Sequence, residues 1–395
     1  MKKTLAAVAV LGAFAGSALA ADVQLYGIID TGLAYVHGDA DGLSQDFDSF
    51  SMESGQGSGS RWGIKGTEDL GNGLTVGFIL EDGITTDDGA DSGVMFNRES
   101  SIFLQGNFGK IAFGRMGALN NGQSSWSRVG MISAFGTSYG EYTARIDRII
   151  ATSGQWDNMI AYETPDFAGF KVYAQYSMGN SKSTGSTSWG SVENESSSDR
   201  FYAVGATYNN GPFAAYLAVD SINYATWNHS LNGDNGGSVE MGDSLTVTLG
   251  GSYDFDVVKV YLGGQYFDEA KLSTFGGVIA DVDIDTAPTV DALVKGYSVS
   301  LSGDAPLGSG KLLFGLGYVD AEASDNYETV SGETFDFKRY VVSVGYDYPF
   351  SKRTDVYAVA SYMQDQWETT TGTPADDQDA DPSAYSIIVG LRHRF

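Results

Sequence analysis

Apolar and polar side chains alternate along most of this chain. The alternation is clearest in four segments where every second side chain is apolar or aromatic, at residues 74–81, 170–177, 311–318 and 339–346. A period of two is typical of a β-strand whose two faces meet different surroundings. Each segment is about ten residues long, the length of a tilted strand that crosses a membrane. The pattern therefore favours an all-β protein.

The connections between these segments alternate between two kinds. Seven are short and rich in Gly, Pro, Asn and Asp, as tight turns require, at residues 68–73, 106–109, 164–169, 209–212, 253–256, 303–309 and 347–353. Eight are long and polar, at residues 37–58, 84–95, 117–155, 179–198, 222–242, 268–292, 321–335 and 365–383. Together they join sixteen strands, and no helix cap or heptad is evident. This arrangement predicts a transmembrane 16-stranded antiparallel β-barrel with short periplasmic turns and long extracellular loops.

The first twenty residues are typical of an export signal. Lys2 and Lys3 precede an apolar run over residues 5–16, and residues 18–20 read Ala-Leu-Ala. That run is too short to span a bilayer, and the small residues after it are typical of a signal-peptidase cleavage site. We therefore predict a signal peptide at residues 1–20 and a single barrel domain at residues 21–395. No later run of apolar residues is long enough for a membrane-spanning helix, so a closed barrel is the remaining way through lipid.

The composition excludes several classes of function. The net charge is −27, and it becomes −29 when the signal peptide is removed with two lysines and no acid. Such acidity argues against nucleic acid as a partner, because phosphate binding needs a dense basic surface. The chain has no cysteine and three histidines, which excludes disulfides, thiolate chemistry and Cys-ligated metals. Little chemistry remains for an enzyme, and no cofactor is expected.

Acidic side chains gather in the long loops. Residues 37–58 and 365–383 hold many carboxylates and no lysine or arginine. One interpretation is a solvated surface whose repulsion resists aggregation. The alternative is that these carboxylates bind divalent cations, alone or as bridges to anionic lipid headgroups.

Five segments resemble the trimeric general porins of proteobacterial outer membranes. They read VQLYGIID, SRWGIKGTEDLGNGL, FGKIAFGR, DNMIAYETPDFAGF and GLRHRF, at residues 23–30, 60–74, 108–115, 157–170 and 390–395. The resemblance spans the chain that follows the signal peptide. It implies an outer-membrane homotrimer, in contact with membrane lipids and lipopolysaccharide, through which small hydrophilic solutes and ions diffuse passively. Small outward residues such as Gly27 and Thr31 would suit its subunit interface.

The resemblance also implies a pore constriction formed by the third long loop, which here is residues 117–155. In the family this loop folds into the lumen opposite a wall of basic side chains. The constriction would select solutes by size and charge. The candidate loop residues are Glu141, Arg145, Asp147 and Arg148, with Arg128 and three aromatic residues nearby, Trp126, Tyr139 and Tyr142.

The candidate wall residues are four bases, Arg61, Lys65, Arg98 and Arg115. Strand alternation directs Arg61 and Lys65 into the lumen, since a charge that faces lipid costs a few kcal/mol near the midplane. Lys171, Lys259 and Lys311 have the same inward parity. Strict alternation sends Arg98 and Arg115 outward, so a β-bulge, for example at Gly114, or a strand end must turn them inward. Bases on the wall and acids on the loop would create a field across the pore, or pair to hold the loop down.

Three other functions compete with a general diffusion porin. A substrate-selective sugar or organic-acid channel would show a continuous track of lumenal aromatics, which Tyr26, Tyr173 and Tyr261 do not establish. An outer-membrane enzyme would need a nucleophile beside a histidine. His37 and His229 lie in long loops, and His393 has lipid-facing parity. A largely structural or adhesive barrel is the third alternative.

Overall fold

The computed structural model describes most of the chain that follows the predicted signal peptide. The described residues are 22–39, 46–91, 93–179, 193, 198–224, 227–228, 238–239, 242–277, 292–332, 334–370 and 378–395. The predicted signal peptide lies outside them. Within them, no helix combines the length and the apolar character needed to cross a membrane.

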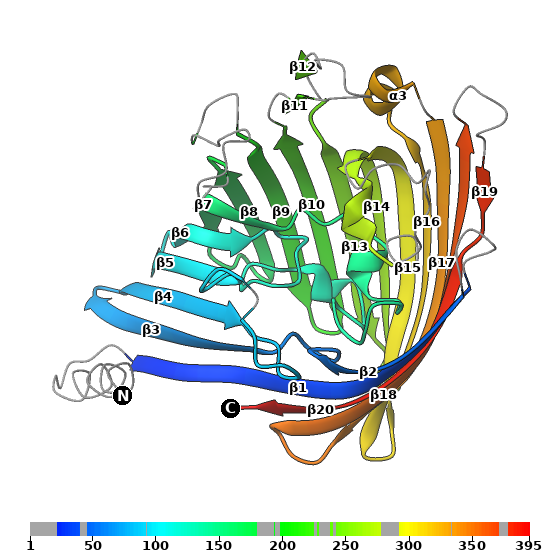
Figure 1. The fold of residues 1–395 in the computed structure, drawn as a ribbon. Coiled ribbons are helices and arrows are strands. Elements are labelled where there is room, and N and C mark those ends of the chain that lie inside the picture. The colour runs from blue at the N-terminus through cyan, green and yellow to red at the C-terminus, as the bar shows by residue number, and fades with distance from the viewer. Residues whose placement is uncertain are drawn as a thin grey trace, which may run out of the picture.

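Within the described residues, a closed antiparallel barrel of 16 strands forms the body of the molecule (Figure 1). The barrel strands are β1 (Asp22–Asp39), β3 (Arg61–Gly71), β4 (Leu74–Gly83), β5 (Glu99–Gly106), β6 (Gly109–Gly117), β7 (Gln155–Glu163), β8 (Phe170–Ser177), β9 (Arg200–Asn210), β10 (Phe213–Asn223), β13 (Leu245–Asp254), β14 (Lys259–Lys271), β15 (Leu293–Leu307), β16 (Gly310–Ala323), β17 (Thr334–Pro349), β18 (Thr354–Thr370) and β20 (Ser383–Arg394). The seven short turns and the eight longer connections all fall where the alternation of the sequence predicts them.

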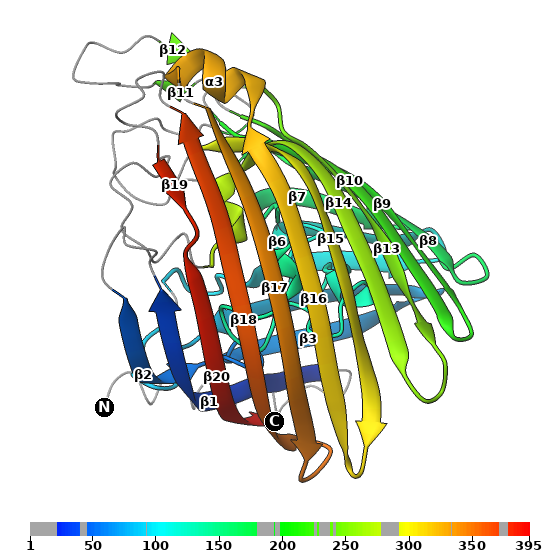
Figure 2. The ribbon, with the colours of Figure 1, turned by 90° about the vertical axis from the view of Figure 1, so that its right-hand side faces the viewer.

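The barrel closes where the first strand meets the last. β1 pairs with β20 from Ile28↔Arg394 to Asp39↔Ser383, and Figure 2 shows β20 between β18 and β1. Two backbone hydrogen bonds between Gly27 and Phe395 complete this seam, at 3.2 and 3.1 Å. The other edge of β1 has two partners in succession. Its first part pairs with β3 and its second part with β2 (Phe47–Ser54).

Two regular elements occur in segments that the sequence analysis assigned to loops. β2 lies within the predicted loop 37–58; it forms because β1 extends beyond β3 and would otherwise leave backbone groups unpaired. The helix α3 (Asp325–Ser331) lies within the predicted loop 321–335. Its caps are present in the sequence: Ser324 accepts a hydrogen bond from the Tyr327 amide, and Gly332 ends the helix with φ +73°. The expectation of no helix caps was therefore wrong.

Short elements complete the described secondary structure. The strands β11 (Trp227–Asn228) and β12 (Ser238–Val239) pair with each other. The strand β19 (Gln378–Ala380) pairs with residues 367–369 of β18. Three 3-10 turns are η2 (Val129–Met131), η3 (Ile146–Arg148) and η4 (Leu272–Phe275). Both η2 and η3 belong to the third long loop, and η4 follows β14.

The two faces of each strand meet different surroundings, as the alternation predicts. On β17, Tyr340, Val342 and Val344 are exposed on the outside, whereas Val341 and Ser343 between them are buried. The inward side chains are buried because the third long loop fills part of the lumen, as the teal segment of Figure 1 shows. Apolar side chains of this loop pack against the wall in two clusters, one on β14–β20 and β1 and the other on β6–β10.

Candidate pore constriction

The third loop, residues 118–154 between β6 and β7, crosses the lumen and is tied to the far wall by hydrogen bonds. The amides of Ala134 and Ala144 donate to the hydroxyl groups of Ser302 on β15 and Ser343 on β17, at 2.9 and 2.8 Å. These inward serines are placed by strand alternation, and each satisfies a backbone group that regular secondary structure leaves free. The loop therefore has a fixed position in the lumen.

The base of the loop is held by a buried carboxylate on β10. Asp220 accepts hydrogen bonds from the Ser153 hydroxyl at 2.5 Å and from the Asn120 amide at 3.0 Å. Ser153 and Asn120 lie at opposite ends of the loop. One carboxylate therefore joins both ends of the loop to the same strand.

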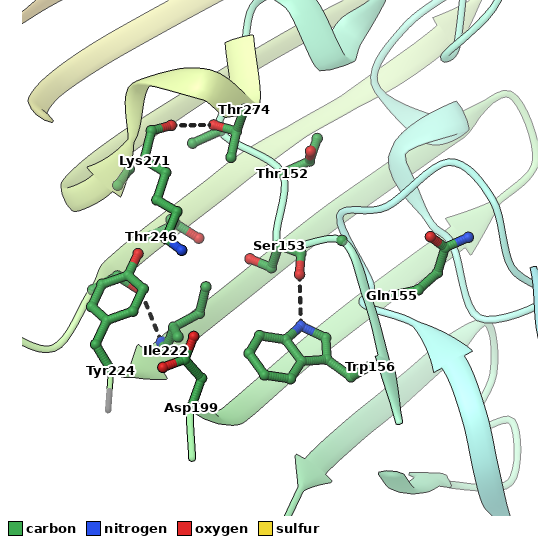
Figure 3. A pocket seen from close by; sticks show the side chains of 14 residues that line it. Thr152, Ser153, Gln155, Trp156, Asp199, Ile222, Tyr224, Thr246, Lys271 and Thr274 are labelled. Carbon is green, nitrogen blue, oxygen red and sulfur yellow. Dashed lines mark hydrogen bonds between the residues drawn. The ribbon is translucent and has the colours of Figure 1, made fainter. Parts of the chain in front are cut away.

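A cavity of about 220 Å³ lies beside this anchor, between the end of the loop and the strands β9 to β14 (Figure 3). The Trp156 indole closes one side and donates to the Ser153 carbonyl at 2.6 Å. The Lys271 ammonium lies 5.3 Å from the centre of the Tyr224 ring. The cavity lies apart from the candidate constriction residues.

On the opposite wall, two predicted bases share one carboxylate. Arg98 Nε donates to Glu81 Oε1 at 2.7 Å, and Arg61 Nε lies 3.5 Å from Glu81 Oε2. The Tyr26 hydroxyl donates to the same carboxylate at 2.9 Å. Glu81 was not among the sequence candidates, although it alternates with the outward Leu80 and so has lumenal parity. The wall thus carries one carboxylate, Glu81, between two guanidinium groups, so these three side chains have a net charge of +1.

The backbone directs Arg98 into the lumen, whereas Arg115 keeps the outward parity of Phe113 on β6. Arg98 precedes β5, which begins at Glu99, so strand alternation does not apply to it. At Arg115 the pairing of β6 with β7 shifts between Gly114 and Met116, which is a β-bulge. Gly114 adopts φ +131°, a conformation that favours glycine. The extra residue of this bulge lies on β7, between Trp156 and Met159, so β6 keeps its alternation. The prediction that a bulge at Gly114 turns Arg115 inward was therefore wrong, and Arg115 pairs with Asp157 at 2.5 Å.

The charged residues of the third loop pair with one another. Arg145 donates two hydrogen bonds of 2.7 Å to Asp147, and Arg148 donates to Glu141 at 2.5 Å. Within the described part of the chain, the ion pairs of both acids are with these two arginines. The acids of the loop are therefore neutralised on the loop itself, which differs from a simple arrangement of acids on the loop and bases on the wall.

These pairs lower the pKa of both loop acids. Burial alone would raise the pKa of Asp147, but Arg145 and Arg148 outweigh burial and hold it below the usual value. Burial likewise opposes ionisation of Glu141, whose pKa is nevertheless lowered by Arg148 and Arg145. Both carboxylates are ionised at neutral pH.

The wall and the loop face each other across a small polar cavity. It has a volume of about 230 Å³, and its lining includes Arg61 and Arg98 from the wall and Arg145 and Asp147 from the loop. The first long loop contributes Gly55, Ser58 and Gly59 to the lining, and further residues of the third loop complete it. The structure thus brings four of the sequence candidates to one gap in the lumen.

The remaining candidates lie outside that lining. Glu141 and Arg148 pair with each other, and Arg115 pairs with Asp157 on β7. The Lys65 ammonium lies 4.8 Å from the centre of the Tyr26 ring.

Two further bases share a carboxylate on β7. Lys171 pairs with Glu163 at 2.6 Å, and Arg128 of the third loop reaches the same carboxylate at 3.1 Å. Both bases lie nearer the short-turn end of the barrel.

Sequence reasoning missed a fully buried ion pair behind the loop. Arg339 on β17 and Asp365 on β18 have no exposed side-chain surface, and Arg339 Nε donates to Asp365 at 2.7 Å. Arg339 also donates to the carbonyls of Arg148, Phe275 and Gly276. It therefore joins the third loop to the segment after β14. The inward parity of Arg339 was visible in the sequence, but its partners were not.

The described residues contain no cluster of three or more side chains arranged to hold a metal ion. Much of the acidic loop sequence, at residues 40–45, 278–291 and 371–377, lies outside the described residues. Binding of divalent cations there stays a prediction.

The three histidines lie apart from one another in the sequence. His37 contacts Asp48 at 3.1 Å, His393 contacts Thr354 at 2.8 Å, and His229 lies outside the described residues.

Known proteins share this sequence and architecture. An outer membrane porin protein of Bordetella pertussis is 34% identical over 424 residues, with all of both chains covered. The solved structure of an anion-selective porin from Comamonas acidovorans is 26% identical, has a TM-score of 0.66, and matches 95% of this chain and 100% of its own. A trimer form of OmpT from Vibrio cholerae has a TM-score of 0.58 at 16% identity, covering 95% of this chain and 100% of its own, which shows a shared fold.

The family assignment rests on most of the chain. The sequence model of the Gram-negative porins matches residues 6–366. The barrel, the inward third loop and the charged gap between loop and wall agree with that match. The chain therefore belongs to the Gram-negative porin family and is a channel protein of the outer membrane.

Proposed function

We propose that this channel passes small hydrophilic solutes and ions passively, without covalent chemistry, and that its constriction favours anions. The observation that carries the preference is the sharing of Glu81 by Arg61 and Arg98. The acids of the loop do not offset this excess, because Arg145 and Arg148 already pair with Asp147 and Glu141. At the gap, the guanidinium groups of Arg61, Arg98 and Arg145 are matched by the carboxylates of Glu81 and Asp147, which leaves one net positive charge.

The acidity of the whole chain acts elsewhere. Much of the charge of −27 belongs to the long loops. Salt screens exposed charges beyond a Debye length of about 8 Å at physiological ionic strength, whereas a solute in the constriction is within contact distance of its lining. The local excess of positive charge therefore outweighs the distant acids. The anion selectivity named for the Comamonas acidovorans porin supports the same direction.

Planar-bilayer recording of the mature protein tests this function. We expect stepwise openings with an ohmic conductance and, across a KCl gradient, a zero-current potential of the sign for chloride preference. The double variant Arg61→Gln/Arg98→Gln should move that potential towards potassium preference. Lys352→Gln/Arg353→Gln, which removes two charges from the turn between β17 and β18, is the matched control. Potassium preference in the unaltered channel would contradict the proposal.

The channel is proposed to be a homotrimer whose outward apolar side chains contact outer-membrane lipids and lipopolysaccharide. The trimer form of OmpT supports this assembly. Mass measurement of the detergent-solubilised protein tests it, and a monomer would contradict it. Gly27 is unsuitable as an interface probe, because a side chain there would meet the Phe395 ring and the Arg61 carbonyl of its own barrel. The Thr31 hydroxyl forms a hydrogen bond with the Thr86 hydroxyl of the same barrel, with 2.5 Å between the two oxygens.

A further inference from the structure

The first long loop ends in a segment that turns into the lumen. This segment, residues 55–60, reads Gly-Gln-Gly-Ser-Gly-Ser and connects β2 to β3; we refer to it as the first-loop strap. So much glycine would predict a flexible chain. In the structure, however, each of its residues has a hydrogen-bonded partner.

The strap is hydrogen-bonded to both the third loop and the barrel wall. The Gln56 carbonyl accepts from the amides of Tyr139 and Gly140 on the third loop, at 2.5 and 3.0 Å. The Gly57 amide donates to the Tyr357 hydroxyl on β18 at 2.9 Å. At its far end, the Gly59 carbonyl accepts from Arg61 Nη1 at 3.0 Å. The strap therefore also orients one of the two wall guanidinium groups of the constriction.

Arg392, near the end of the last strand, holds the middle of the strap. Its Nη1 donates to the Gly57 carbonyl at 2.7 Å and to the Ser58 hydroxyl at 3.0 Å. Its Nη2 lies 2.9 Å from Asp347 and 2.7 Å from Asp355. The Arg392 side chain is 6% exposed, and the Tyr139 hydroxyl donates to the same Asp347 carboxylate. The buried Arg392 guanidinium thus links the strap to the barrel wall and, through Asp347 and Tyr139, to the third loop.

The strap also lines the constriction. Gly55, Ser58 and Gly59 border the 230 Å³ cavity together with Arg61 and Arg98. A Cβ atom at Gly59 would lie 3.2 Å from Arg98 Nη1, and its next neighbour is another atom of the same flexible side chain. Gly59 has no positive φ. A side chain at this position is therefore compatible with the backbone and would be directed at the constriction arginine.

We propose that the first-loop strap is a second constriction element, in which Ser58 and Gly59 limit the size and charge of solutes and Arg392 is the positioning residue. The absence of a side chain at Gly59 leaves Arg98 accessible to a passing anion. The width of the gap then depends on two loops rather than one. This inference holds whether or not the whole channel favours anions, because it concerns which residues line the path.

Cysteine accessibility tests the lining directly, because the chain has no native cysteine. Ser58→Cys is recorded in planar bilayers during addition of a negatively charged methanethiosulfonate reagent. Ser138→Cys, on the third-loop side of the same cavity, is the positive control. Ser309→Cys, in the turn between β15 and β16, is the negative control. We expect stepwise loss of conductance at residues 58 and 138 and none at 309. Unchanged current at residue 58, with block at residue 138, would overturn the proposal.

Charge at Gly59 tests the second part of the proposal. Gly59→Asp should shift the zero-current potential towards potassium, because the new carboxylate meets Arg98. Gly59→Asn has nearly the same size without charge and should lower conductance with little shift in potential. Gly130→Asp adds the same charge to the third loop, at a glycine with open space around it and outside the cavity lining. An equal shift from Gly59→Asp and Gly130→Asp would refute a specific role for the strap.

The role of Arg392 is tested by pairing a disruptive and a conservative variant. Arg392→Gln should release the strap and increase current fluctuations in the open channel. Arg392→Lys keeps the charge beside Asp347 and Asp355 and should restore part of the quiet open state. Quiet openings in folded Arg392→Gln channels would show that the strap does not need this residue.

Discussion

The third loop faces two walls of the same barrel, and the charges on these walls differ in their surroundings. Behind the loop, Arg339 and Asp365 form an ion pair with no exposed side-chain surface, surrounded by apolar side chains such as Phe275 and Phe337. In front of the loop, Arg98 and Glu81 form a pair of the same length, 2.7 Å, whose side chains are 11% and 14% exposed and border a cavity. The two ion pairs therefore have the same length but differ in their access to solvent.

The difference follows from what solvent does to a charge. A buried pair loses the hydration of both ions, and removing one partner leaves an uncompensated charge in a poorly polarisable interior. A pair beside water keeps part of its hydration and contributes little to stability, yet its field reaches a solute in the gap. We conclude that the wall behind the loop fixes its position, and that the wall in front acts on solutes.

The largest expected effect comes from removing Arg339. Arg339→Met leaves Asp365 buried without its cation and removes three hydrogen bonds to backbone carbonyls. We expect a loss of about 3–5 kcal/mol in the free energy of unfolding, measured by denaturant titration in detergent. Arg339→Met/Asp365→Leu should recover much of it, because both charges are then absent. A single variant as stable as the unaltered protein would remove the distinction between the walls.

A smaller effect is expected at Gly114 on β6, which faces the bulge of β7. A Cβ atom at Gly114 would collide with the Ser100 carbonyl oxygen, and the residue has φ +131°. Gly114→Ala should therefore cost about 1–3 kcal/mol and move Arg115 away from Asp157. Gly130→Ala, at an open position without positive φ, is the control. Equal stability of the two variants would show that the bulge is not strained by a side chain.

Acid pH should act on the pairs within the loop. The folded-state pKa values of Asp147 and Glu141 are lowered, so their pairs stabilise the loop above the unfolded values of about 3.9 and 4.3. That stability is lost as the pH falls below about 4 and through the lowered pKa values. Protonation leaves Arg145 and Arg148 unbalanced, so chloride preference should rise there.

Zero-current potentials recorded between neutral pH and pH values below the usual carboxyl range measure this change. Glu141→Gln/Asp147→Asn should show the stronger chloride preference already at neutral pH and a smaller acid transition. A transition of unchanged size in that double variant would assign the effect to other carboxylates.

The smallest effect is expected at an exposed pair at the loop end of β15. Lys295 contacts Glu322 and Asp325, and the Asp325 side chain is 85% exposed. Lys295→Met should change the free energy of unfolding by less than about 1 kcal/mol. It should leave the zero-current potential unchanged, because Lys295 does not border the constriction. A loss as large as that of Arg339→Met would show that burial does not govern these pairs.

Much of the fold was predictable because local chemistry repeats at each strand. Alternation gave the inward direction of Lys171 and Arg61, and glycine-rich turns marked the short ends. The two missed elements, β2 and α3, had weaker signals in the sequence. β2 forms because β1 extends beyond its pairing with β3. α3 is one short helix capped by Ser324 and Gly332. The segments that predicted the family also predicted the inward third loop and its candidate residues.

The partners of the charged residues were not predictable in the same way. Arg339 meets Asp365 across neighbouring strands, Arg98 meets Glu81, and Arg392 meets the strap more than 330 residues away in the chain. Contacts of this kind depend on where closure of the barrel brings distant segments, and a sequence period carries no information about that distance.

The sequence by itself determined the barrel, the orientation of its strands and the parity of its inward charges, because the period of two and the cost of charge in lipid act residue by residue. The tertiary structure decided which charges remain available to a solute. Asp147 and Glu141 are neutralised by arginines of their own loop, Arg61 and Arg98 share one acid, and the glycine strap lines the gap. Each outcome depends on distances that exist only after the last strand has closed against the first.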